Sequence, residues 1–126
     1  MKTLLIAAAV VALATPALAH HSGAMFDRNT ARTITGTVRE FSWTNPHASF
    51  AVDVPDAGGQ PTVWQIEMNS PNNLVADGWK RSTIKVGDKV TVGIYPLRDG
   101  RPGGTYVNIT LADGKKLGAE SLAAAR

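Results

Sequence analysis

The chain contains three histidines, and their positions suggest a single metal site. His20 and His21 are adjacent near the start of the sequence, and His47 follows an Asn-Pro pair. If the chain is cut before His20, that residue offers its α-amine and its imidazole to one ion. A second imidazole, from His21 or His47, completes a set of three nitrogens called a histidine brace. Amine and imidazole nitrogens suit Cu(II), which lies at the top of the divalent affinity order, so the histidines predict a bound copper ion.

Two further side chains near the histidine pair are weaker candidate ligands. Met25 could add a thioether for Cu(I), and Asp27 could add a carboxylate. The alternative is that no metal binds. In that case the histidine pair is only a polar start that the signal peptidase tolerates, and His47 only caps a turn.

Residues 1–19 have the three-part layout of a secretory signal. Lys2 is followed by an apolar run over residues 4–14 and then by Ala17-Leu18-Ala19. The run is too short for a membrane span, which needs roughly 20 apolar residues. We therefore expect cleavage after Ala19, with cleavage after Ala17 as the competitor, and a periplasmic or secreted protein without a membrane span.

Composition narrows the class of function. There is no cysteine, so disulfides, thiolate nucleophiles and zinc thiolate sites are excluded. The formal net charge of +3 is not accompanied by a cluster of lysine or arginine, and we therefore expect no nucleic-acid partner. No motif nominates a catalytic residue, so the chain is not expected to be an enzyme; a copper-dependent oxidase is the alternative.

The remainder of the chain predicts strands separated by turns, with one short helix. Five stretches are rich in alternating apolar or β-branched residues, and a helical pattern over residues 70–79 separates the third from the fourth. This order predicts a five-stranded, OB-like Greek-key barrel; a small β-sandwich, which usually has about seven strands, is the alternative. The expected organisation is a signal peptide (1–19), an N-terminal arm (20–32), the barrel domain (33–117) and a flexible tail (118–126).

Local signals refine this barrel. The apolar phase of the first strand slips near Glu40, which predicts a bulge or a sharp coil, and Gly36 favours bending. Ser70 is suited to cap the helix, Pro71 to occupy its first position, and Gly78 to stop it.

A second, metal-free hypothesis uses the surface near the Asn-Pro-His turn. Trp43, Asn45 and Trp79 are candidate ligand-surface residues, and the barrel face around them would bind a peptide, a glycan or another envelope protein. Tryptophans in a domain of this size more often pack into the core, which is the position expected for Trp64.

Four stretches of the chain together resemble a known family. They are HHSGAMFD, GTVREFSWTNPHASFAVDV, SPNNLVADGWKRSTIKVGDKVTV and NITLADGK. The chain resembles, over nearly all of its mature length, the small secreted bacterial proteins catalogued as domain of unknown function 6152. The resemblance implies no activity or ligand, but it implies that the histidine pair and the Asn-Pro-His turn belong to the family pattern.

Overall fold

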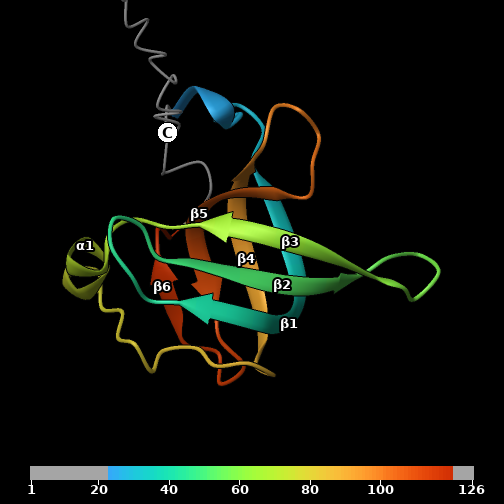
Figure 1. Cartoon of the computed structure of the whole chain (residues 1–126). Coiled ribbons are helices and arrows are strands. Elements are labelled where there is room, and N and C mark those ends of the chain that lie inside the picture. The colour runs from blue at the N-terminus through green and yellow to red at the C-terminus, as the bar shows by residue number, and fades with distance from the viewer. Residues whose placement is uncertain (1–22, 121–126) are drawn as a thin grey trace, which may run out of the picture.

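Residues 23–120 are described by a computed structural model, in which strands wind around one hydrophobic core (Figure 1). In chain order the elements are a 3-10 turn η1 (Gly23–Met25) and the strands and helix β1 (Arg32–Ser42), β2 (Ser49–Pro55), β3 (Pro61–Glu67), α1 (Pro71–Ala76), β4 (Lys89–Pro96), β5 (Gly103–Thr110) and β6 (Lys116–Gly118). The expected signal peptide, His20, His21 and residues 121–126 of the expected tail lie outside the described residues.

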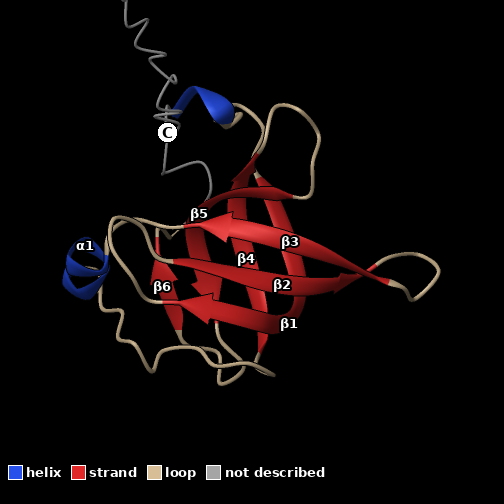
Figure 2. Cartoon of the chain, in the orientation of Figure 1, coloured by secondary structure: helices blue, strands red, loops and turns tan. Residues whose placement is uncertain are grey.

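Pairing between β3 and β5 closes the sheet into a barrel (Figure 2). The strand order is β3-β2-β1-β4-β5-β6, and these neighbours are all antiparallel. The closing pair is parallel and joins Gln65–Glu67 to Gly103–Thr105. The predicted five-stranded OB-like barrel is confirmed, and the β-sandwich alternative is wrong. The three-residue strand β6, which extends the sheet beyond β5, was not predicted.

The first strand is long because it belongs to both sides of the barrel. Its first half pairs with β4 and its second half with β2. The register against β2 shifts between Val38 and Glu40, which confirms the predicted irregularity. Close approach of β2 explains Gly36, because a Cβ atom there would collide with the backbone carbonyl of Asp53. The missing side chain lets the two strands cross tightly where β1 coils.

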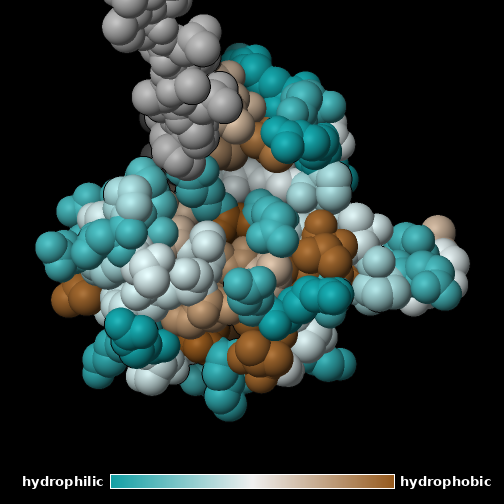
Figure 3. All heavy atoms as spheres, viewed as in Figure 1, coloured by the Kyte–Doolittle hydropathy of each residue, from teal (hydrophilic) through white to brown (hydrophobic). Residues whose placement is uncertain are grey.

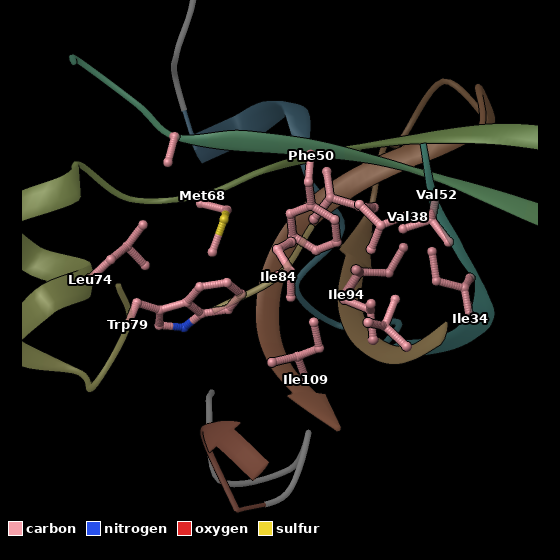
Figure 4. Packing of buried hydrophobic residues seen from close by; sticks show 14 residues of the cluster. Ile34, Val38, Phe50, Val52, Met68, Leu74, Trp79, Ile84, Ile94 and Ile109 are labelled. Atoms are coloured by element: carbon pink, nitrogen blue, oxygen red, sulfur yellow. The ribbon is translucent and has the colours of Figure 1, made fainter. Parts of the chain in front are cut away.

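The core is formed by one face of each of the five barrel strands, together with the helix region. The largest fully buried side chains are Trp79, Phe50, Ile66, Leu74, Ile84, Ile94, Ile109, Val38, Val52 and Val92. Figure 4 shows Leu74 and Trp79 reaching the cluster from the side of α1. The apolar strand faces and the short helix therefore bury one continuous cluster, as the alternating pattern predicts.

The helix α1 begins at the predicted residues. Ser70 has extended backbone angles, its hydroxyl accepts a hydrogen bond from Asn73 N at 3.5 Å, and Pro71 follows at the first helical position. At the other end Gly78 adopts φ 92°, a left-handed conformation that ends the helix and favours glycine.

Replacing Ser70 with alanine is expected to destabilise the domain by about 1 kcal/mol, because the capping oxygen for an N–H of the first turn is lost. Urea unfolding followed by tryptophan fluorescence measures this change. Asn72→Ala, on an exposed position of the same helix, is the control and is expected to cost nothing. Equal midpoints for the Ser70 variant and the parent would contradict the capping role.

Candidate functional site

His47 lies in the loop that connects β1 to β2, and its ring is held in a fixed orientation. Its Nδ1 lies 3.0 Å from the backbone carbonyl oxygen of Met68, and 3.9 Å from Oε1 of Glu67. The neighbouring backbone is fixed as well, since Ala48 N donates to Asn69 O at 3.0 Å and Met68 N donates to Ala48 O at 2.9 Å. A carbonyl oxygen only accepts, so Nδ1 carries the proton, and the neutral ring then keeps its lone pair on Nε2.

This environment is the one that a metal-binding histidine usually has. Histidine ligands of metal ions generally donate the second ring N–H to a backbone carbonyl or a carboxylate, which fixes the tautomer and the ring orientation. Met68 O supplies such an acceptor for His47, and the Glu67 carboxylate lies next to it. His47 therefore has a fixed ring orientation, with Nε2 as the ring nitrogen that is not bonded to Met68 O.

The N-terminal arm is fastened to the connection between β4 and β5. Phe26 forms an isolated β-bridge with Leu97, and Arg98 N donates to the carbonyl of Met25 at 2.9 Å. The Arg98 side chain adds a hydrogen bond from Nε to Ala24 O at 3.0 Å. These contacts place η1 above the end of β3, close to the loop that carries His47 (Figure 1).

A cavity of about 420 Å³ separates the arm from the barrel. Figure 3 shows the corresponding hollow below the arm. We call it the first cavity, and its lining residues are Met25, Phe26, Thr44, Asn45, Pro46, His47, Ala48, Ser49, Gln65, Ile66, Glu67, Leu97, Arg101 and Gly104. Three of the residues selected from the sequence, namely Met25, Asn45 and His47, therefore lie around one cavity.

A second cavity, of about 640 Å³, also has His47 in its lining. It is lined by Gly23, Phe26, Arg28, His47, Glu67, Met68, Asn69, Leu74, Asp77, Tyr95, Thr105, Tyr106, Val107, Gly118 and Ala119. His47, Glu67 and Phe26 line both cavities. The histidine thus lines two cavities, and residues of the N-terminal arm contribute to the lining of each.

Asp27 is not part of this arrangement, although the sequence made it a candidate ligand. It lines neither cavity, and its Oδ1 accepts from Asn29 N at 3.0 Å and lies 3.9 Å from Arg98 Nη1. A hydrogen bond from the Thr30 side chain, helped by Asn29 and Arg98, lowers the pKa of Asp27. The carboxylate stabilises the turn of the arm.

None of the three tryptophans is fully exposed, as a ligand-binding surface would require. Trp79 is 1% exposed, so its expected place on that surface is wrong; its Nε1 donates to the Tyr106 hydroxyl at 3.2 Å. Trp43 is half-buried and packs edge-on against Phe41, with ring centroids 5.8 Å apart. Trp64, expected in the core, is also half-buried and lies 5.0 Å below the guanidinium of Arg32.

The structure adds residues that have no sequence signal of their own. Glu67 is the last residue of β3 and comes beside His47 only because β2 pairs with β3 at Ser49. Arg101 reaches the first cavity from the β4–β5 loop. Burial raises the pKa of Tyr106, in the second cavity, to about 12. The one feature that could have indicated Glu67 is its place as a charged residue at the end of β3, the strand that closes the barrel by pairing with β5.

Within residues 23–120 no three histidine, aspartate or glutamate side chains lie close enough together to hold a metal ion. A metal at His47 would therefore need donors of another kind, or donors from the preceding residues. Across the same range, none of the helices has the length and apolar character needed to cross a membrane.

Comparisons with known proteins support the fold and the family. A sequence model described as "Family of unknown function (DUF6152)" matches residues 8–108. Two crystal forms of the mitochondrial single-stranded DNA binding protein Rim1 from S. cerevisiae are similar in structure. One has a TM-score of 0.51 at 15% identity, covering 66% of this chain and 93% of Rim1. The other has a TM-score of 0.50 at 13% identity, covering 73% and 98%. None of the curated proteins compared with the chain matches it.

Proposed function

Because the chain belongs to the Family of unknown function (DUF6152), whose description assigns no activity, we propose its function from the candidate site. The protein is a small exported binding module that holds a copper ion in an N-terminal histidine brace. Signal cleavage after Ala19 exposes His20, which binds through its α-amine and imidazole. His47 supplies the imidazole fixed by the barrel, and His21 is the alternative to it. The proposal includes no catalytic step.

The observation that carries the proposal is that the arm and His47 line the same two cavities. Met25 and Phe26 share the first cavity with His47, and Gly23 shares the second. Since an extended chain spans about 3.3–3.6 Å per residue, the three residues from 20 to 22 reach roughly 10 Å beyond Gly23. Gly23 and His47 line the same second cavity, so this reach gives the His20 amine a route toward the His47 ring.

The orientation of His47 supports the same conclusion. Nδ1 donates to Met68 O, so in the neutral ring the nitrogen with the lone pair is Nε2. A copper ion bound there receives neutral nitrogens from three groups, which is a donor set that suits Cu(II).

Blocking the amino terminus tests the brace. We expect a chain that begins at His20 to bind Cu(II) about 100-fold or more tightly than one with three alanines in front, because the α-amine donor of His20, and with it the chelate ring to its imidazole, is lost. Isothermal calorimetry against a competing chelator measures both affinities. The extension must have three residues, since one or two would make a histidine the third residue, where the amine, two amides and imidazole chelate Cu(II) on their own.

The dependence on pH is the control for this experiment. A free α-amine has a pKa of about 7.7–8.0, and Cu(II) must displace its proton. Binding should therefore weaken between about pH 8 and about pH 6, and more steeply for the authentic terminus than for the extended chain. Equal affinities and equal slopes for the two chains would overturn the brace.

The likeness to Rim1 does not change this proposal. Rim1 is named as a single-stranded DNA binding protein, and identities of 13% and 15% indicate a shared fold only. The absence of a nucleic-acid partner stays a prediction, based on a formal net charge of +3 without a basic cluster.

A further inference from the structure

We propose that the first cavity also holds Cu(I), through the thioether sulfur of Met25 and Nε2 of His47, without the amino terminus. This inference rests on the proposed function for the identity of the metal. It does not rest on that function for the ligands, because both side chains belong to the described part of the protein. The module would then bind each oxidation state of copper with a different donor set that shares His47.

Met25 is placed on the cavity wall by its backbone. Its carbonyl accepts from Arg98 N at 2.9 Å, and the next residue, Phe26, is 7% exposed and bridges to Leu97. The Met25 side chain itself is 37% exposed and lines the cavity. A methionine has three rotatable side-chain bonds and a polarizable sulfur, so it can close on an ion while its backbone remains fixed.

The chemistry of the two donors fits the reduced ion. Thioethers are soft ligands and select Cu(I) over harder divalent ions, whereas imidazole binds both states of copper. Cu(I) has a filled d shell and accepts as few as two ligands, so one sulfur and one imidazole form a complete site. Cu(II) prefers more donors in a planar arrangement, which the histidine brace supplies.

The walls of the first cavity favour an ion of low charge. The lining includes apolar groups from Phe26, Ile66 and Leu97, and burying a charge among such groups costs less for one positive charge than for two. The Glu67 carboxylate, beside the His47 ring, offers one compensating negative charge, and the Arg101 guanidinium in the same lining is paired with Asp99 at 2.7 Å. The surroundings thus point to the monovalent state.

Met68 is the methionine to compare with Met25, because it also lies close to His47 in the structure. Its backbone carbonyl oxygen lies 3.0 Å from Nδ1 of the histidine ring. The side chain is 3% exposed and packs in the core near Trp79 and Phe50 (Figure 4). A Met-to-Leu change removes one sulfur at either position, but of the two methionines only Met25 lines the first cavity.

Competition with bicinchoninate, a coloured Cu(I) chelator, under nitrogen tests the inference. Met25→Leu is expected to lower Cu(I) affinity by about 100-fold, since loss of even an outer partner of a metal ligand costs about 10–100-fold. Met68→Leu, a volume-conserving change, should leave it unchanged. X-ray absorption of the Cu(I) protein should show a sulfur neighbour that Met25→Leu removes, which separates ligation from any change in folding.

The same variants distinguish failure of this inference from failure of the proposed function. Unchanged Cu(I) affinity in Met25→Leu, or no sulfur neighbour in the parent, would overturn the Cu(I) site and leave the brace intact. Unchanged Cu(II) affinity in the three-alanine chain, with weakened Cu(I) binding in Met25→Leu, would remove the brace and support the Cu(I) site.

Discussion

Replacing His47 with asparagine is expected to lower the affinity for both Cu(II) and Cu(I) by about 100-fold or more while the barrel stays folded. The Nδ2 atom of asparagine lies near the position of Nδ1 in histidine and can donate to Met68 O in its place. The variant can therefore keep the structural hydrogen bond while lacking the ring nitrogen Nε2. Calorimetry for Cu(II) and bicinchoninate competition for Cu(I) measure the two losses.

Urea unfolding without metal is the control for this variant. If the hydrogen bond is kept, the free energy of unfolding should change by no more than about 0.5 kcal/mol. A folded His47→Asn protein that binds copper like the parent would show that His47 is not a ligand, and that the two cavities are unrelated to the metal. Copper binding would then have to be explained by the terminal residues alone.

The barrel could be predicted from the sequence because its determinants are local. Alternating residues identify the strands, Ser70 and Pro71 identify the helix start, and the slip near Glu40 identifies the bulge of β1. The short strand β6 has no such signal, because three residues are too few for an alternating pattern. It forms only because β5 presents a free edge beside it.

The position of Trp79 shows where local pattern is insufficient. The residue follows the helix, so neither the helical nor the strand period assigns it a face. Its burial depends on Gly78, whose φ of 92° turns the chain back so that Trp79 N donates to Leu74 O at 2.9 Å. This turn directs the ring into the core, where Tyr106 accepts its N–H. Sequence alone could identify the glycine stop but not the direction of the following side chain.

The candidate site was predicted in its residue types and not in its geometry. Histidine and methionine are selected by their chemistry, but Met25 and His47 share a cavity only because the arm attaches to the β4–β5 connection. Glu67 joins them through the pairing of β2 with β3. These are contacts between segments distant in the chain, and they are determined by closure of the barrel.

Gly36→Ala is expected to destabilise the domain by about 3 kcal/mol, near the upper end of the cost of overpacking. The added methyl group would collide with the carbonyl oxygen of Asp53, which is backbone of the paired strand and cannot rotate away. Relief requires β1 and β2 to separate next to the pair formed by Thr37 and Asp53, at the point where β1 coils. Urea unfolding followed by tryptophan fluorescence measures the loss.

Gly58→Ala is the matched control for the strain at Gly36, because it makes the same chemical change in the exposed loop between β2 and β3. There the nearest atom to an added Cβ is Asp56 Oδ1 at 3.4 Å, an ordinary contact, and the expected change is within about 0.5 kcal/mol. Equal stability of the two variants would mean that β1 and β2 can move apart at Gly36 without cost. The coil of the first strand, and with it the closure that brings the arm to His47, would then not depend on the missing side chain.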